Sequence, residues 1–112
     1  MQTILSDGYD LSGGAEGLRE EIDVASIMPA GIEYYVITIV GSDGSDACAV
    51  VEGEDMQTDP TKCGTLIQVY PQTFGPYKIS RGNPALIVRA GDAAVGAYTV
   101  YALSDGMVDY GR

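Results

Sequence analysis

This chain of 112 residues contains no histidine, so its Asp and Glu carboxylates are the main candidates for acid–base catalysis or metal binding. Without histidine the most common general base and metal ligand is missing, and neither a Ser-His-Asp nor a Cys-His arrangement can form. Carboxylates gather in "SDGSD" (Asp43, Asp46) and in "EGED" (Glu52, Glu54, Asp55). Neither stretch has the spacing of an EF-hand loop, and Asp and Gly are ordinary turn formers. We therefore expect no catalytic residue, no metal ion and no cofactor.

The two cysteines, Cys48 and Cys63, flank a long polar loop over residues 53–64. Their separation of fifteen residues is not that of a Cys-x-x-Cys metal or redox motif. A disulfide between them would close the loop and contribute about 3 kcal/mol in the chain-entropy model. Two isolated buried thiols are the other interpretation, and the sequence leaves both open.

Six of the eight tyrosines lie in or beside stretches that we predict to be strands: Tyr34, Tyr35, Tyr70, Tyr77, Tyr98 and Tyr101. Packing in the core and on sheet surfaces explains most of them. Tyr34 and Tyr35 are adjacent, so they point to opposite faces of a strand and one of them can be exposed. Exposed tyrosine is typical of protein interfaces, which makes Tyr34 a candidate assembly contact.

The formal net charge of −10 excludes whole classes of partner. Nucleic-acid backbones and anionic membranes are bound mainly through Lys and Arg, so we expect neither as a partner. The charge is uneven: residues 1–60 hold thirteen acids and one base, whereas residues 61–112 hold three acids and five bases. This asymmetry fits a solvated acidic face, or complementarity between the acidic part of one copy and the basic part of the next.

The chain from residue 22 onward is a series of short apolar runs separated by turn residues. The strongest, "IEYYVITIV", places Tyr35, Ile37 and Ile39 on one face and apolar residues on the other, which favours a central strand. We predict about seven strands, over residues 22–27, 32–40, 47–52, 65–70, 77–80, 85–90 and 97–103. Their spacing is typical of an all-β, antiparallel sandwich, and no alternation of strands with helices suggests a nucleotide-binding fold.

The first 21 residues are polar and contain four glycines. We interpret residues 1–21 as an extended N-terminal arm, with a short helical turn over residues 15–22, and residues 22–112 as the β-sandwich domain. The arm could dock in cis or on a neighbouring chain. Its apolar residues are then candidate assembly contacts: Ile4, Leu5, Tyr9 and Leu11.

The stretch "PALIVRAGDAAVGAYTVYALSDG", residues 84–106, resembles the last two strands of bacterial and phage immunoglobulin-like domains. The match lies in Gly96, Tyr98, Thr99 and Val100, preceded by an apolar strand. The resemblance implies an immunoglobulin-like sandwich, in which Gly91 and Gly96 let the backbone turn and Tyr98 and Val100 fill the space between the sheets. By analogy of fold and size, small single domains of this class are similar to head-decoration and tail proteins of phages.

These observations predict a non-enzymatic structural assembly protein, with a bacteriophage or other virus particle as its setting. Its expected partners are protein subunits: a major capsid or tail protein, copies of itself, or both. Self-association would give a homo-oligomer, and a trimer is the natural guess for a decoration protein. No run approaches the ~20 apolar residues of a membrane-spanning helix, and "MQTILSDGYDLSGG" lacks the features of a secretory signal. The alternative functions are an extracellular binding module, such as an adhesin or carbohydrate-binding domain, and a filament subunit.

Overall fold

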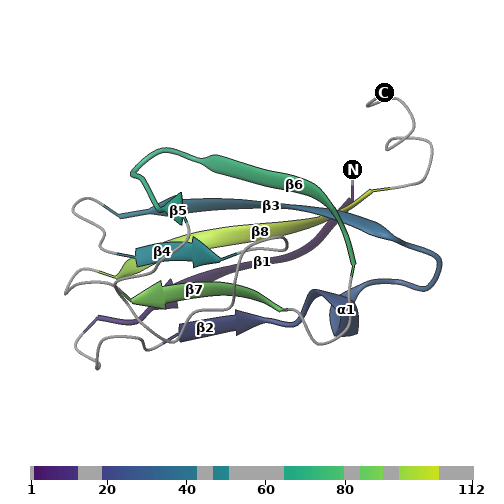
Figure 1. Cartoon of the computed structure of the whole chain (residues 1–112), viewed down its shortest axis with the longest axis horizontal. Coiled ribbons are helices and arrows are strands. Elements are labelled where there is room, and N and C mark those ends of the chain that lie inside the picture. The colour runs from purple at the N-terminus through teal and green to yellow at the C-terminus, as the bar shows by residue number, and fades with distance from the viewer. Residues whose placement is uncertain are drawn as a thin grey trace.

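The computed structural model describes residues 2–12, 19–42, 47–50, 65–79, 84–89 and 94–103. Within these ranges most of the backbone lies in eight strands, and one short helix joins two of them (Figure 1). The elements in chain order are β1 (Gln2–Asp10), β2 (Arg19–Ile22), α1 (Val24–Ile27), β3 (Tyr34–Gly41), β4 (Ala47–Val50), β5 (Thr65–Leu66), β6 (Gln72–Lys78), β7 (Ala85–Arg89) and β8 (Val95–Leu103).

The strands form two antiparallel sheets of four strands each. Sheet A has the order β1-β8-β3-β6, and sheet B has the order β2-β7-β4-β5. The first half of the chain pairs with the second half in reverse: β1 with β8, β2 with β7, β3 with β6 and β4 with β5. The β3–β8 and β4–β7 pairs then complete the sheets. This nested pairing of eight strands in two sheets is that of a jelly roll.

The predicted all-β antiparallel sandwich is confirmed by this architecture. The strand order is a finer feature, and it differs from that of an immunoglobulin sandwich, whose last two strands share one sheet. Here β7 lies in sheet B and β8 in sheet A, so the chain crosses from one sheet to the other between them. The resemblance implied instead that these two strands share one sheet. The strand added to the predicted seven is β1.

Strand β3 forms as its alternation predicts. Tyr35, Ile37 and Ile39 are buried in the core between the sheets, with exposed fractions of 2%, 0% and 0%. The opposite face of the strand carries Tyr34 and Thr38, which are half-buried. Strand β3 is hydrogen-bonded on both sides, to β8 and to β6, so its predicted central position is confirmed.

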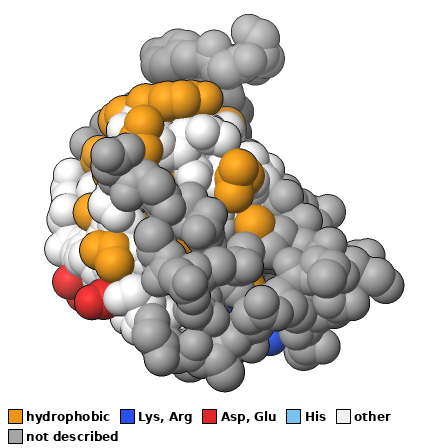
Figure 2. All heavy atoms as spheres, turned by 90° about the vertical axis from the view of Figure 1, so that its left-hand side faces the viewer, with side chains coloured by type: hydrophobic (Ala, Val, Ile, Leu, Met, Phe, Trp, Pro, Cys, Tyr) orange, Lys and Arg blue, Asp and Glu red, His pale blue; other side chains and the backbone are white. Residues whose placement is uncertain are grey.

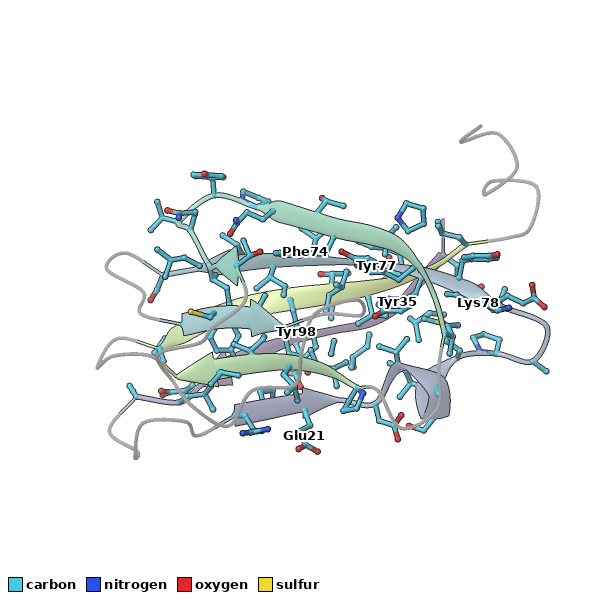
Figure 3. All side chains as sticks on the ribbon, viewed as in Figure 1. Glu21, Tyr35, Phe74, Tyr77, Lys78 and Tyr98 are labelled. Carbon is cyan, nitrogen blue, oxygen red and sulfur yellow. The ribbon has the colours of Figure 1, made fainter. Side chains whose placement is uncertain are left out.

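The core is asymmetric in side-chain size. Sheet A supplies large side chains, including Tyr35 and Tyr98, and Figure 3 shows how they lie among the strands. Sheet B meets them with the fully buried methyl groups of Ala47, Ala49 and Ala85, together with isoleucines. Small residues opposite large ones let the two inner faces interdigitate at close-packed density. Tyr98 and Val100 fill the space between the sheets, as the sequence predicted.

The prediction for residues 15–27 was wrong in both its parts over residues 19–27, which the structure describes. Residues 19–22, expected to be helical, form β2, because each of them pairs with a residue of the buried strand β7. The predicted strand over residues 22–27 ends at Ile22 and gives way to α1. Ser26 donates from its backbone nitrogen and from its hydroxyl to the Asp23 carbonyl, at 3.2 and 2.9 Å, which closes the helical turn. Tertiary pairing here overrides the local preference.

The expected N-terminal arm is part of the sandwich. Strand β1 pairs with β8 along its length, interrupted by one bulge between Thr3 and Leu5. Tyr9 and Leu11 are core residues, 4% and 5% exposed, and the Leu11 amide donates to the Ala94 carbonyl at 2.8 Å. In the described part of the chain, the residues before the predicted boundary at residue 21 therefore belong to the sandwich and form no independent arm. The sequence missed this because the partner of β1 lies about ninety residues further along the chain.

Deleting residues 1–12 should abolish cooperative folding. The deletion removes two core side chains, each worth about 2–5 kcal/mol, and strips one edge of β8 of its hydrogen-bond partner. This loss is comparable to the whole stability of a small domain, on the order of 5–15 kcal/mol. Urea denaturation followed by circular dichroism measures it, with exposed Gln2→Ala in the full chain as a control that should change little. A truncated chain that unfolds at the wild-type midpoint contradicts the assignment of β1 to the core sheet.

Gly96 is needed for a close approach and not for a turn. It lies inside β8, and the described glycines with positive φ are Gly31 and Gly75. A Cβ on Gly96 would overlap the Val40 carbonyl oxygen and lie 2.7 Å from Cζ of Tyr9. The missing side chain therefore makes room for the Tyr9 ring over β8. Gly91, the other glycine of the predicted turn, lies outside the described residues.

Gly96→Ala should destabilise the protein by about 1–3 kcal/mol, because overpacking forces the Tyr9 ring and the β3–β8 ladder apart. The matched control is Gly8→Ala on the neighbouring strand, where the new Cβ would meet the Gly96 carbonyl oxygen at 3.4 Å, an ordinary contact. Urea unfolding of the two variants provides the comparison. Equal stability of both would show that Gly96 is not a close-approach position.

Candidate functional site

The described residues hold no cluster of three or more His, Cys, Asp and Glu side chains that could bind a metal ion. The acidic clusters of the sequence analysis, at 43–46 and 52–55, lie outside the described residues. Cys63 does so too, and the alternatives for the two cysteines therefore remain as predicted. Cys48 itself is buried, in β4. In the described ranges no helix has the length and apolarity to cross a membrane.

One of the two ionisable groups with a shifted pKa, Tyr98, lies between the sheets. Burial raises the pKa of Tyr98 above 10.0, and the negative charges of Glu20 and Asp7 raise it further. The Tyr98 hydroxyl is also hydrogen-bonded to the Glu20 carboxylate, which joins β8 of sheet A to β2 of sheet B. A neutral, hydrogen-bonded tyrosine of this kind holds the sheets together and offers no nucleophile.

A second shifted group closes a turn. Asp10 accepts hydrogen bonds from the hydroxyl and the backbone amide of Ser12, at 2.5 and 3.0 Å, and these bonds lower the pKa of its carboxyl group. The arrangement is an Asx-type turn that ends β1. Both perturbed groups therefore have structural explanations.

The feature that packing does not explain is the segment 66–71, which comprises the last residue of β5 and the connection to β6 and which we call the docking tip. It carries three exposed large hydrophobic residues, Leu66, Val69 and Tyr70, with exposed fractions of 49%, 58% and 59%. Figure 2 faces the end of the sandwich at which this connection lies; hydrophobic side chains gather on its upper part, and acidic ones show only at the lower left. Large apolar side chains grouped in the open mark an interaction site.

The docking tip is held in place from beneath. Ile67 is 1% exposed and anchors the tip in the core, and its amide donates to the Ala47 carbonyl at 2.9 Å. The Gly41 amide donates to the Gln68 carbonyl at 2.7 Å, which ties the tip to the end of β3. The tip is therefore bonded to strands of both sheets.

The side-chain amide of Gln72 completes this support. Its Oε1 accepts from the Gln68 backbone amide at 2.7 Å, and its Nε2 donates to the Leu66 carbonyl at 3.3 Å. One side chain at the start of β6 thus bridges two backbone groups of the tip. Val69 and Tyr70 are presented on a backbone that is already fixed, which lowers the entropy lost when a partner binds.

The assembly contacts expected from the sequence lie elsewhere. Tyr9 and Leu11 belong to the core and are not available to a partner. Ile4 and Leu5 are half-buried in β1, and Tyr34 is half-buried on the outer face of β3. The structure does not bring these five residues together into one surface.

Sequence analysis missed the docking tip because it extended β5 over residues 65–70. A strand there would have turned Val69 and Tyr70 to opposite faces of a sheet, and β5 ends at Leu66 instead. The available signal was Pro71 directly after "VY", because proline removes a ladder donor and marks the end or edge of a strand. Comparison of the chain with protein-family models, curated proteins and solved structures finds no match.

Removing the Tyr98 hydroxyl should make the free energy of unfolding fall less steeply with pH in the alkaline range. Because the pKa of Tyr98 is raised in the folded state, the unfolded chain loses this proton first, and stability falls as the pH rises above about 10. Tyr98→Phe removes that titration, so its free energy of unfolding should decline less steeply than that of the wild type above pH ~10, while being lower at neutral pH.

Urea denaturation at a series of pH values measures these slopes. Ile87→Val, which destabilises the core without removing a titrating group, is the control and should keep the wild-type slope. Parallel curves for Tyr98→Phe and the wild type would contradict a raised Tyr98 pKa.

Proposed function

We propose that this chain is a non-enzymatic structural assembly protein that docks on a neighbouring protein subunit through the docking tip. The observation that carries this proposal is the pair Val69 and Tyr70, more than half exposed on a backbone fixed by Gln72 and Ile67. A rigidly displayed tyrosine is a typical anchor of a protein interface, and an aliphatic side chain beside it can fill part of the same pocket. Their burial in a pocket of the partner would supply most of the binding free energy.

The proposed setting is a virus particle, with the chain as a decoration or tail component. Support for it comes from the jelly-roll strand order, which viral capsid domains share with lectins and cupins. This support is an analogy of fold, so the site and not the fold has to carry the function. In a particle, many copies of one tip on a regular lattice would add avidity to a modest individual contact.

A carbohydrate-binding module is the second candidate. The exposed ring of Tyr70 favours it, because aromatic side chains offer an apolar face on which a flat ligand can stack. The two functions differ in the role of Val69: an anchor in a protein pocket needs both side chains, whereas stacking on a sugar needs the ring alone.

In the test, a photoreactive phenylalanine analogue replaces Tyr70, and the cells that make the protein, or the particles that contain it, are irradiated. We expect a cross-link to one and the same protein in repeated experiments, and the Val69→Ser substitution should abolish this cross-link. The same analogue at Thr65, an exposed position in β5, is the control and should not give this adduct. Identical adducts from both positions, or none from position 70, would contradict docking through the tip.

Binding measurements with the identified partner should then show a loss of about 10- to 100-fold for Tyr70→Ala, the range of an interface hot spot. The thermal midpoint should hardly move, because the ring is 59% exposed. A glycan array screened with the wild type and with Tyr70→Ala separates the alternatives. Glycan binding that is lost with Tyr70→Ala and kept with Val69→Ser would favour the carbohydrate module.

A further inference from the structure

The outer face of sheet A has a composition unlike that of the rest of the chain. Reading across the strands, its three central rows are formed by Gly8, Ala97 and Val40; by Ser6, Thr99, Thr38 and Thr73; and by Thr3, Tyr101 and Val36. None of these positions is charged. Asp10 and Lys78 lie only at the two ends of the face. In a chain with sixteen acidic residues, three central rows without a carboxylate among the described residues form a surface from which charge is excluded.

The middle row is a line of hydroxyl groups that crosses all four strands. Ser6 and Thr99 are hydrogen-bonded at 3.1 Å, and Thr38 and Thr73 at 3.3 Å. Thr99 and Thr38 are direct neighbours in the β3–β8 register. Such a row aligns only because the register of three separate strand pairs agrees.

Most of this face is accessible to a partner, although Val36 in the third row is buried, with an exposed fraction of 6%. Ser6, Gly8, Thr73 and Ala97 are exposed, and Thr38 and Thr99 are half-buried. The inward residues of β6, Phe74 and Tyr77, pack against the core instead, and the Tyr77 ring lies 5.9 Å from that of Tyr35 (Figure 3). The hydroxyl row therefore lies on the side of sheet A that faces away from sheet B.

We propose that the outer face of sheet A binds the same face of a second copy of this chain, about a two-fold axis. The first argument is electrostatic. Two copies with a formal charge of −10 repel each other, and they meet with least repulsion through a surface whose central rows carry no charge. A partner of opposite charge would instead be recognised by acidic residues, and Glu20 and Glu21 lie on β2 in sheet B, while Asp10 lies only at the end of this face.

The second argument is the chemistry of the hydroxyl group. Serine and threonine hydroxyls both donate and accept hydrogen bonds, so a row of them is complementary to itself. A surface of carboxylates or of ammonium groups could not pair with its own copy in this way. Two-fold interfaces require such self-complementarity, because one patch serves as both partners.

The third argument is size. The four strands lie about 4.8 Å apart and are seven to nine residues long, at about 3.3 Å per residue, so the face spans roughly 19 by 23–30 Å. Two such faces would bury on the order of 900–1,100 Å², close to the ~1,000 Å² expected of a specific interface. The pairing is therefore expected to be reversible, and it leaves the docking tip of each copy free for another protein.

Sedimentation equilibrium of the purified chain tests this proposal. We expect a monomer–dimer equilibrium that Thr99→Glu weakens by at least tenfold, because it places a carboxylate at the centre of each face. Ser6→Glu, on the exposed edge of the same face, is a second variant that tests the face without touching a central strand. Thr65→Glu adds the same charge at an exposed position of sheet B and should leave the dimer unchanged.

Salt provides an independent check. Because the central rows of the face are uncharged and the copies repel each other, raising the ionic strength should strengthen dimerisation, whereas pairing driven by opposite charges would weaken.

Four outcomes would each overturn the proposal: a monomer at all accessible concentrations, a trimer, a dimer that salt dissociates, or equal effects of Thr99→Glu and Thr65→Glu. Dimerisation abolished by Tyr70→Ala but not by Thr99→Glu would also overturn it. Since Tyr70→Ala leaves a sheet A dimer intact, failure here is distinct from failure of docking through the tip.

Discussion

Pairing of the first strand with the last is the constraint on which the rest of this structure depends. Strand β8 lies between β1 and β3, so its backbone is satisfied on both edges only when the N-terminal residues are in place. Gly96 and Tyr9 mark the point of closest approach, where the absence of a Cβ lets the ring lie over the neighbouring strand. With β8 fixed, Tyr98 reaches Glu20 on the opposite sheet, and the hydroxyls of Ser6, Thr99 and Thr38 fall into line.

The chain route explains why this closure is needed. Every connection except that from β4 to β5 passes from one sheet to the other, so sequential neighbours rarely pair. The two sheets are held together by the interdigitation of large residues of sheet A with Ala47, Ala49 and Ala85 of sheet B. Pairing strands that are distant in sequence costs loop-closure entropy before most of the contacts have formed. We therefore expect the strands to form together and the fold to be strongly cooperative.

The two surfaces proposed for binding differ in their chemistry, and this separates their roles. The docking tip presents a few large apolar side chains on a supported connection, which suits insertion into a pocket of another protein. The outer face of sheet A is broad, with no charge in its three central rows and a row of hydroxyls, which suits contact with its own copy. Under the two proposals, the chain is a subunit with one surface for its own copy and another for a neighbouring protein.

The sequence by itself determined the all-β class and the faces of β3, because alternation of side chains along a strand is a local property. The core positions of Tyr98 and Val100 were implied by the resemblance of residues 84–106 to immunoglobulin-like domains. The absence of histidine likewise ruled out histidine-based catalysis without any structure. Only the tertiary structure decided that residues 2–10 form a strand, that residues 19–22 are extended, and that Val69 and Tyr70 lie on a tip. Each of these depends on a partner far away in sequence: β8 for β1, β7 for β2, and Gly41 and Ala47 for the tip. Register across such pairs is set by packing in three dimensions, and no local pattern specifies it.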